Sequence, residues 1–382
     1  MINIDDPLVQ LDDQLDKMAE SLQLDASRQT RMESAYKAVH NFVKDDDVFF
    51  KDLVTEVYPQ GSVRIGTTNR PTKGSEFDLD TVIQLKPEAA RFGANRIWNE
   101  LERRLKESGV YMDRLKPKNR CMRILYENDF HMDVLVACQQ SSYCNNTILV
   151  PTKDRSSMQI SNPRGHADWF IDKANRVAET LLEKSDRQRS VTLERLPSDN
   201  FRRKKPLQRS VQLLKRYRDI FFAADDTYAT SSIILTTIAG HYYQGEESIY
   251  NAMDGIINRI IFDANRGNGR IRVVNPVNSS EDFTSKWDNG SKYYLAFLRF
   301  ANHLRTEWQK FKQQPSVITE SQILKGLFGD DPFNAGSALR IEELKSLRES
   351  GQLRQDRKTG ILTSSAVGST LVKPNTFFGE QI

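Results

Sequence analysis

Several short groups of residues have the types and spacing that phosphate chemistry needs. Gly61-Ser62 is followed by Gly66-Thr67 and by Asp78-Leu79-Asp80, and a further aspartate, Asp133, comes later in an apolar segment. A small turn exposes backbone N–H groups, and the adjacent hydroxyl can join them in donating hydrogen bonds to a triphosphate. Aspartates supply hard oxygen ligands, which suit Mg²⁺ and the phosphates that Mg²⁺ binds. The spacing therefore predicts metal-assisted phosphoryl or nucleotidyl transfer.

The aspartates are predicted to lie on two strands. Segment 77–85 is β-like, and side chains two residues apart on a strand share a face, so Asp78 and Asp80 project together. In segment 130–138 the apolar residues share one face and Asp133 lies on the other. If the two strands are neighbours, three carboxylates converge, and their repulsion would require cations. The alternative interpretation makes the Gly-Ser pair a plain turn and the aspartates ordinary strand-end residues.

The elements around these residues are predicted from the periodicity of apolar side chains. Residues 9–45 carry apolar side chains at steps of three and four, which predicts one long helix. Residues 91–109 predict an amphipathic helix that ends at a glycine. Segments 122–128 and 130–138 predict a β-hairpin, on which His131 shares a face with Asp133 and packs or supports the site.

The second half of the chain is predicted to be helical. Residues 151–166 are expected to form a linker or loop, and residues 273–287 a polar loop. Residues 315–382 are expected to hold one helix, over 337–350, and a loop-rich end. The predicted long helices are 166–184, 206–223, 231–243, 246–264 and 292–311.

Length and composition exclude several classes of protein. The chain has 382 residues, too many for one typical domain, and its 38% hydrophobic and 28% charged residues are those of a globular chain. It has no apolar run long enough to cross a membrane, and its acidic start lacks the apolar core of a secretory signal. Cys121, Cys138 and Cys144 are too irregularly spaced for a disulfide framework or a zinc site. We therefore expect a cytoplasmic protein without a membrane segment.

The glycine and aspartate groups together resemble the polymerase-β-like nucleotidyltransferase superfamily. Within it, the chain is similar to the bacterial CD-NTases, DncV-like enzymes related to cyclic GMP-AMP synthase and 2′-5′-oligoadenylate synthetase. The similarity continues through the basic helix 207–218, the helix start at 231–237 and the loop 275–278 with Phe283 and Trp287. These segments span about residues 55 to 300 and occur in the family's order.

The resemblance implies a mixed α+β fold. A polymerase-β-like nucleotidyltransferase lobe with a central mixed sheet is expected over 1–160, and a helical-bundle lobe over 161–325. The long helix at the start of the chain is expected to brace both lobes. Residues 326–382 are expected to form a C-terminal segment that is partly helical and then loop-rich.

The resemblance also implies an activity and roles for individual residues. Family enzymes make cyclic or linear oligonucleotides from nucleoside triphosphates, and they act in anti-phage signalling. Gly61 and Ser62 would hold the β- and γ-phosphates of the donor nucleotide. Asp78 and Asp80 would ligate two Mg²⁺ or Mn²⁺ ions, and Asp133 would ligate one of them and help activate the attacking hydroxyl.

Two residues of the helical lobe are expected to complete the nucleotide site. By resemblance, Lys215 would reach the donor triphosphate, and Ser232 would bind the same phosphates at a helix N-terminus. The alternative for Lys215 is a solvated helix face. The alternative for Ser232 is an ordinary N-cap, and Ser231 competes for either role.

The expected partners are small molecules and proteins. ATP is the expected substrate, with GTP or another nucleoside triphosphate beside it. The basic run 201–218 can serve phosphates, but the chain lacks the zinc cluster by which the cyclic GMP-AMP synthase branch binds DNA, which argues against nucleic acid. An activating or conjugating protein partner is implied, although Ile382 is not the small residue that C-terminal conjugation needs. A terminal RNA nucleotidyltransferase, a linear-oligonucleotide synthase and a nucleotide-binding pseudoenzyme remain alternatives.

Overall fold

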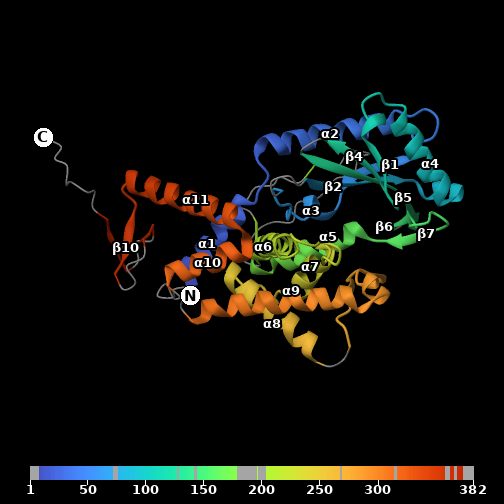
Figure 1. Ribbon diagram of the computed structural model, residues 1–382. Coiled ribbons are helices and arrows are strands. Elements are labelled where there is room, and N and C mark those ends of the chain that lie inside the picture. The colour runs from blue at the N-terminus through green and yellow to red at the C-terminus, as the bar shows by residue number, and fades with distance from the viewer. Residues whose placement is uncertain are drawn as a thin grey trace, which may run out of the picture.

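The computed structural model describes most of the chain. It forms a lobe built around a sheet and a lobe of helices, and the C-terminal helices project from one end (Figure 1). The described residues are 8–71, 76–126, 129–141, 144–178, 196, 204–266, 269–313, 316–357, 362–364 and 368–372.

In the described part of the chain, the first lobe contains a mixed sheet of seven strands. The strand order is β1-β2-β5-β4-β3, and β6 and β7 continue from the second half of the long strand β5. Strands β2 and β5 are parallel, and the other neighbours are antiparallel. The strands are β1 (Val54–Pro59), β2 (Phe77–Leu85), β3 (Leu115–Pro117), β4 (Met122–Tyr126), β5 (Phe130–Ser141), β6 (Cys144–Pro151) and β7 (Met158–Ser161).

The two faces of this sheet have opposite character. Helices α2 (Ala26–Lys44) and α4 (Gly93–Lys106) pack on one face, where Leu79 and Met132 are fully buried. Burial of one such side chain contributes about 1.5–3 kcal/mol, so the alternation along each strand fixes which side faces the helices. The aspartates between these apolar residues consequently lie on the opposite face. The predicted mixed α+β fold and the predicted hairpin of β4 and β5 are confirmed.

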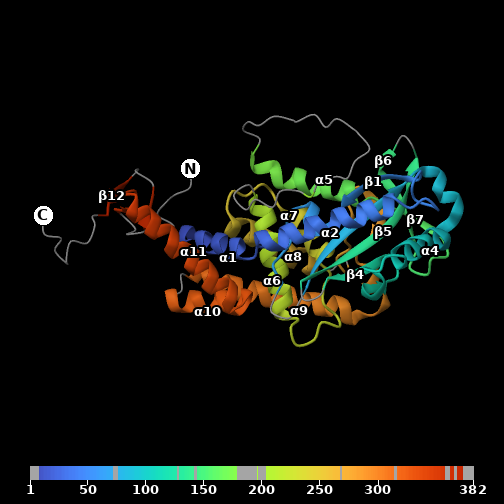
Figure 2. The same ribbon diagram turned by 90° about the horizontal axis from the view of Figure 1, so that it is seen from above.

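The predicted single helix over 9–45 is wrong, because the structure has two helices there. Helix α1 (Leu8–Ser21) ends before Asp25, whose carboxylate accepts a hydrogen bond of 2.8 Å from the backbone N–H of Arg28 and begins α2. The two helices follow one another along the molecule (Figure 2). Helix α1 belongs to the hydrophobic core of the helical lobe, and α2 belongs to the core of the sheet lobe. Each lobe is therefore braced by its own helix.

The helical lobe surrounds one large hydrophobic core. The predicted helices at 206–223, 231–243, 246–264 and 292–311 are confirmed within a few residues at each end. Of the helix predicted over 166–184, only the first part is described, and it begins earlier than expected. The helices are α5 (Pro163–Ala174), α6 (Pro206–Phe221), α7 (Ser232–Tyr242), α8 (Ile249–Asn265), α9 (Ser291–Gln309), α10 (Val317–Phe328) and α11 (Asp330–Glu349).

Three segments expected to be irregular contain regular structure. The predicted loop 151–166 contains β7 and the start of α5, where Asn162 caps the helix by accepting from the N–H of Gly165 at 2.8 Å. The predicted loop 273–287 contains the hairpin of β8 (Val274–Asn275) and β9 (Asn278–Asp282). Helix α10 was not predicted. These elements are short or polar, and their partners are distant in sequence, so local patterns did not reveal them.

The C-terminal part extends the helical lobe. Helix α11 packs along α1, and a small sheet follows it, with β10 (Arg354–Asp356) between β11 (Leu362–Thr363) and β12 (Ser369–Leu371). The end of the chain, on which the conjugation hypothesis depends, lies outside the described residues. Among the described helices, none is long and apolar enough to cross a membrane.

Candidate active site

The Gly-Ser turn lies directly beside a carboxylate of the neighbouring strand. The short helix α3 (Gly61–Arg64) follows β1, and Gly61 has a φ of 62°, in the left-handed region that favours glycine. A Cβ atom on Gly61 would collide with the Asp80 carboxylate. The Ser62 hydroxyl accepts a hydrogen bond of 3.1 Å from Thr68 and lines the cavity between the lobes. Only glycine therefore lets this turn approach the carboxylates so closely.

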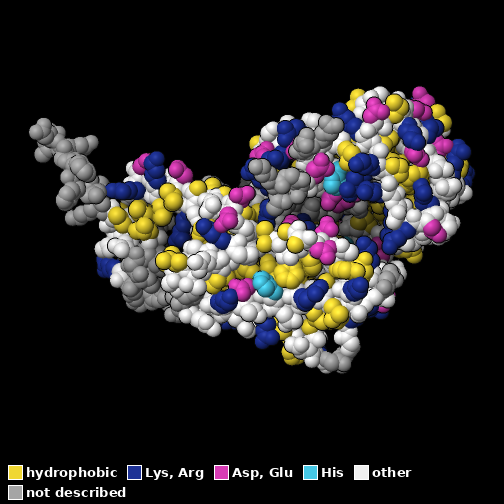
Figure 3. Space-filling view, in the orientation of Figure 1, with side chains coloured by type: hydrophobic (Ala, Val, Ile, Leu, Met, Phe, Trp, Pro, Cys, Tyr) yellow, Lys and Arg dark blue, Asp and Glu magenta, His cyan; other side chains and the backbone are white. Residues whose placement is uncertain are grey.

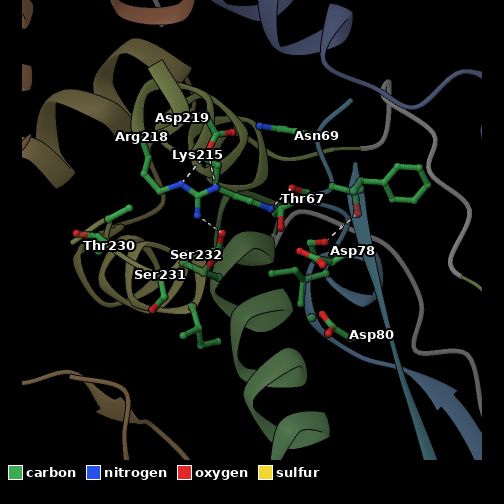
Figure 4. A pocket seen from close by; sticks show the side chains of 18 of the residues that line it. Thr67, Asn69, Asp78, Asp80, Lys215, Arg218, Asp219, Thr230, Ser231 and Ser232 are labelled. Atoms are coloured by element: carbon green, nitrogen blue, oxygen red, sulfur yellow. Dashed lines mark hydrogen bonds and ion pairs between the residues drawn. The ribbon is translucent and has the colours of Figure 1, made fainter. Parts of the chain in front are cut away.

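The parallel pairing of β2 with β5 brings the predicted carboxylates together. The register pairs Asp80 with Asp133 and Asp78 with His131, so all four side chains leave the same face of the sheet. This is the arrangement predicted for neighbouring strands. Asp78 and Asp80 line the cavity, and Figure 4 shows them opposite the residues of the helical lobe.

The carboxylates perturb one another in the way that a cation site requires. The pKa of Asp80 is raised to about 7. Burial is the largest cause, and the negative charges of Asp78 and Asp133 add to it. Burial also opposes ionisation of Asp78, but contacts with His131 and nearby Arg123 hold the pKa of Asp78 below its ordinary value. The His131 ring contacts Glu76 through Nδ1 at 3.1 Å and Asp78 through Nε2.

An arginine that was not predicted to belong to the site holds Asp133. Arg123 on β4 is the register partner of Asp133, and its Nε and Nη2 donate to the two carboxylate oxygens at 2.7 Å each. Its Nη2 also lies 3.4 Å from Asp78. A bidentate pair of this kind is a strong ionic hydrogen bond. The side chain of Asp133 is thus beside the cavity but directed toward Arg123.

The donor set fits hard divalent cations. Asp78, Asp80 and Asp133 offer only oxygen ligands, and burial together with the charges of its two neighbours raises the pKa of Asp80, so that a bound cation would favour its ionised form. Within the described residues, no three His, Cys or acidic groups are already gathered as a complete metal site. The third carboxylate would have to turn partly away from Arg123, or share its oxygens with it, to ligate an ion.

The helical lobe contributes positive charge and a hydroxyl to the same cavity. Lys215 on α6 is buried and donates to the backbone oxygen of Thr67 at 2.9 Å, and burial lowers its pKa to about 8. Ser231 is the N-cap residue of α7, and Ser232 is its first residue. The Ser232 hydroxyl accepts a hydrogen bond of 2.6 Å from Arg218 (Figure 4). Arg218, one helical turn beyond Lys215, also lines the cavity.

The cavity is large and is shared between the lobes. Its volume is about 1160 Å³, which exceeds the roughly 300–1,000 Å³ of most small-molecule pockets. It is visible as a hollow between the lobes in Figure 3. All of the predicted site residues except Asp133 line it, namely Gly61, Ser62, Asp78, Asp80, Lys215 and Ser232.

A second polar group, not predicted from the sequence, lines the cavity where β7 meets β9. Glu281 accepts hydrogen bonds from the Ser161 hydroxyl at 2.6 Å, from the Asn162 backbone N–H at 3.2 Å and from the Asn275 amide at 2.7 Å. These donors come from both lobes and hold the carboxylate in one orientation. In the described residues no Lys or Arg forms an ion pair with Glu281, so its charge is compensated by neutral donors.

A buried histidine lies near this carboxylate. The His166 ring is 6% exposed, and its Nε2 lies 2.9 Å from the Thr237 hydroxyl of α7. Thr237 donates its own proton to the Ile233 carbonyl, so His166 Nε2 carries the hydrogen of this contact. Burial lowers the pKa of His166 to about 4, and the imidazole is therefore neutral near pH 7.

Comparison with known proteins decides the family. The Second Messenger Oligonucleotide or Dinucleotide Synthetase domain matches residues 9–175. The chain is 38% identical over 374 residues to the c-di-GMP synthase of Roseivirga ehrenbergii, which covers 97% of this chain and 98% of the relative. The chain belongs to the CD-NTase family. It is a nucleotidyltransferase with a second-messenger synthetase domain, as the resemblance implied, and CD-NTases generally use divalent metal ions.

Solved CD-NTase structures share this fold. Bradyrhizobium diazoefficiens CdnG in complex with GTP matches with a TM-score of 0.69 and 21% identity, covering 87% of this chain and 99% of that chain. E. coli MS115-1 CdnC in complex with HORMA-deltaN matches with a TM-score of 0.61 and 13% identity, covering 83% and 96%. At these identities the comparison establishes the fold of this CD-NTase.

Proposed function

We propose that this CD-NTase makes cyclic di-GMP from two molecules of GTP. The observation that supports the proposal most is the 38% identity to a c-di-GMP synthase over nearly the full length of both chains. The cavity adds a physical argument, because it joins phosphate-binding groups at one place to a rigid carboxylate at another.

The roles of the site residues follow from their positions. Ser62 and the backbone N–H groups of its turn would donate to the β- and γ-phosphates of the donor GTP. Lys215 and Ser232 would bind the same triphosphate from the helical lobe. Asp78 and Asp80 would hold two divalent ions with Asp133. These ions would neutralise the triphosphate and lower the pKa of the attacking hydroxyl.

The reaction needs two displacements of the same kind. A ribose hydroxyl of one GTP attacks the α-phosphorus of the other, a P–O bond to pyrophosphate breaks, and the hydroxyl proton passes to a base or to water. Asp133 would orient that hydroxyl after turning partly away from Arg123, which holds both of its oxygens. The linear product then turns over in the cavity, and a second attack closes the ring and releases a second pyrophosphate. One site can perform both steps because its volume of about 1160 Å³ leaves room for both nucleotides.

The choice of guanine is supported by Glu281. Its oxygens already accept three hydrogen bonds, but a carboxylate offers about four lone-pair sites, so it can accept another donor. The Watson–Crick edge of guanine presents adjacent N–H donors at N1 and N2, whereas adenine presents one amino donor at N6 beside an acceptor at N1 that a carboxylate repels. A fixed carboxylate therefore favours guanine.

The test is product formation from purified protein. The chain is incubated with GTP, ATP, or all four nucleoside triphosphates and Mg²⁺ or Mn²⁺, then treated with phosphatase and analysed by mass spectrometry. We expect a phosphatase-resistant cyclic di-GMP that Asp78→Asn/Asp80→Asn does not make. A linear product would indicate a linear-oligonucleotide synthase, RNA-dependent addition a terminal transferase, and nucleotide binding without turnover a pseudoenzyme. Each of these three results would overturn the proposal.

A biological setting follows from the family resemblance. We propose that the cyclic product acts in anti-phage signalling and that a protein partner controls its synthesis, as a complex of CdnC with a HORMA protein has been solved. The test is phage resistance of cells that carry the gene with its genomic neighbours. Resistance should be lost with Asp78→Asn/Asp80→Asn, and unchanged plaque counts would contradict the role.

A further inference from the structure

We propose that basic side chains on β3 and β4 form a second phosphate site, which binds the 5′-triphosphate of the acceptor nucleotide and, until it turns over, that of the linear intermediate. The site, here called the basic row, consists of Arg123, Lys116 and Lys118, with Arg120 in the turn between the strands. The inference rests on the proposed function, since only a reaction between two nucleoside triphosphates has an acceptor with its own triphosphate.

The register of the sheet places the basic row in line with the catalytic carboxylates. Asp80 pairs with Asp133, Asp133 pairs with Arg123, and Arg123 pairs with Lys116. Paired residues on neighbouring strands have side chains on the same face. Leu115, next to Lys116, packs into the hydrophobic core on the other face. Lys116 therefore projects on the face that carries the carboxylates.

The row continues beyond the end of β3. The backbone N–H of Lys118 donates to the oxygen of Cys121 at 3.0 Å, which extends the ladder by one pair and gives Lys118 the same orientation as Lys116. Neighbouring strands are about 4.8 Å apart, so Lys116 is about 10 Å from Asp133 across the sheet. Lys116, Lys118 and Arg123 do not line the cavity. The row is thus a surface next to the catalytic centre and distinct from the donor triphosphate site.

Apart from Arg123, which pairs with Asp133, the basic residues of the row have no ion-pair partner among the described residues. Residues 114–123 contain five Lys or Arg and no acidic residue. Lys116 and Lys118 are exposed, and within the described residues neither has an ion-pair partner. Arg120 donates to the neutral amide of Gln159 at 3.1 Å. In Figure 3, basic side chains gather beside acidic ones and a histidine at the rim of the hollow.

Other basic side chains of the same lobe show the contrast. On α4, Arg103 pairs with Asp46, Glu100 and Glu107, and Lys106 pairs with Glu102 at 2.7 Å. Their charges are balanced within the protein, and those of the lysines in the basic row are not. An unbalanced basic surface attracts an anionic ligand.

The reaction requires such a surface at this position. The acceptor hydroxyl must reach Asp133, but the acceptor triphosphate is repelled by the three carboxylates. The donor triphosphate is assigned to Ser62, Lys215 and Ser232. On the face of the sheet that carries Asp133, the next positive charges lie across β4 toward β3. The acceptor triphosphate is therefore expected to extend over Arg123 toward Lys116 and Lys118.

Lysines on an edge strand also have a structural use, because they prevent pairing with another sheet. That use predicts no preference for a particular nucleotide. A role in acceptor binding predicts that the lysines matter only when the ligand carries a 5′-triphosphate. The two roles can therefore be separated with ligands that differ in that group alone.

The experiment compares binding of pppGpG and of GpG, the same dinucleotide without 5′-phosphates, by isothermal titration calorimetry with Ca²⁺ in place of Mg²⁺. The variants are Lys116→Gln/Lys118→Gln and, as a matched control, Lys37→Gln/Lys44→Gln on α2, which covers the opposite face of the sheet. We expect the first variant to bind pppGpG about tenfold more weakly than the parent, with GpG affinity unchanged. Lys116→Arg/Lys118→Arg should restore the affinity.

Two results would overturn the inference. In one, the parent binds pppGpG and GpG equally well. In the other, the glutamine variant loses affinity for both ligands, or for neither. Thermal melting of each variant verifies its fold. Failure of this test leaves cyclic di-GMP formation by the parent intact, whereas failure of the proposed function would appear as absence of that product, so the two failures are distinguishable.

Discussion

At the scale of single residues, the site combines groups that repel one another with groups that relieve the repulsion. Asp80 is half-buried beside Asp78 and Asp133, and burial and these two charges raise its pKa to about 7. Arg123 binds both oxygens of Asp133, and His131 contacts Asp78. These contacts relieve part of the repulsion between the three carboxylates.

The close packing of the Gly61 turn against the Asp80 carboxylate can be tested by substitution of Gly61. We expect Gly61→Ala to reduce kcat/KM at least about 100-fold, because the added Cβ collides with the Asp80 carboxylate and displaces it. Gly93→Ala is the matched control, since Gly93 also has a positive φ, 76°, but has open space around its Cβ position. Both variants should lose about 1 kcal/mol of stability from the strained backbone. Equal activity of the two variants would show that the collision is unimportant.

The proposed role of Glu281 in selecting guanine over adenine can be tested by substitution of Glu281. In Glu281→Gln the amide oxygen can still accept from Asn275, and the amide N–H can donate to Ser161, so the fold should tolerate the change. The remaining acceptor for guanine is lost, and the ratio of kcat/KM for GTP to that for ATP should fall about tenfold or more. Glu307→Gln on α9, outside the cavity, is the control. An unchanged ratio, or an equal loss for both nucleotides, would remove Glu281 from base selection.

At the scale of elements, the contact between α5 and α7 depends on a neutral histidine. His166 is buried, and its pKa is lowered to about 4, whereas an unfolded chain would have a histidine near 6.5. Between these values the unfolded state binds a proton that the folded state does not. The free energy of unfolding therefore rises with pH across this window, and as pH falls from 6.5 to 4 the contribution of His166 is lost.

We expect His166→Gln to remove this dependence while keeping the N–H donor toward Thr237. The parent should lose about 3 kcal/mol more stability than the variant between pH 6.5 and pH 4. Urea denaturation at several pH values measures the difference, and comparison with the variant cancels the titration of groups such as Asp80. Parallel pH profiles for the two proteins would contradict the assignment.

The parts of the site that could be predicted are those that leave a pattern within one short segment of the sequence. The alternation around Asp78, Asp80 and Asp133 predicts their strands and faces, but their convergence was conditional on the two strands being neighbours, which the structure shows to be so through a parallel pairing. Arg123 lies in a strand that was predicted, but its contact with Asp133 depends on the register of β4 on β5. Glu281 is placed by a hairpin whose contact with β7 is distant in sequence. Contacts of this kind leave no periodic pattern in a single sequence.

At the scale of the whole molecule, the cavity is lined by residues of both lobes. Its walls come from β2 and α3 on one side and from α6 and α7 on the other, so a nucleotide bound there contacts both lobes. Helices α1 and α2 are separate, and each belongs to the core of a different lobe. A bound triphosphate should couple the unfolding of the two lobes.

We expect a non-hydrolysable GTP analogue with Mg²⁺ to raise the melting temperature of the parent by about 3 °C at a concentration 100 times its Kd, because binding to the folded state alone contributes about 2.7 kcal/mol. Mg²⁺ removal with EDTA should abolish most of the shift, and Asp78→Asn/Asp80→Asn should show little of it with Mg²⁺ present. Lys215→Met should reduce the shift from the side of the helical lobe, since it removes a buried cation of the cavity without touching the carboxylates. Differential scanning calorimetry distinguishes the outcomes. If the analogue moved only one of two separate transitions, the nucleotide would bind a single lobe, and the shared cavity would not be the binding site.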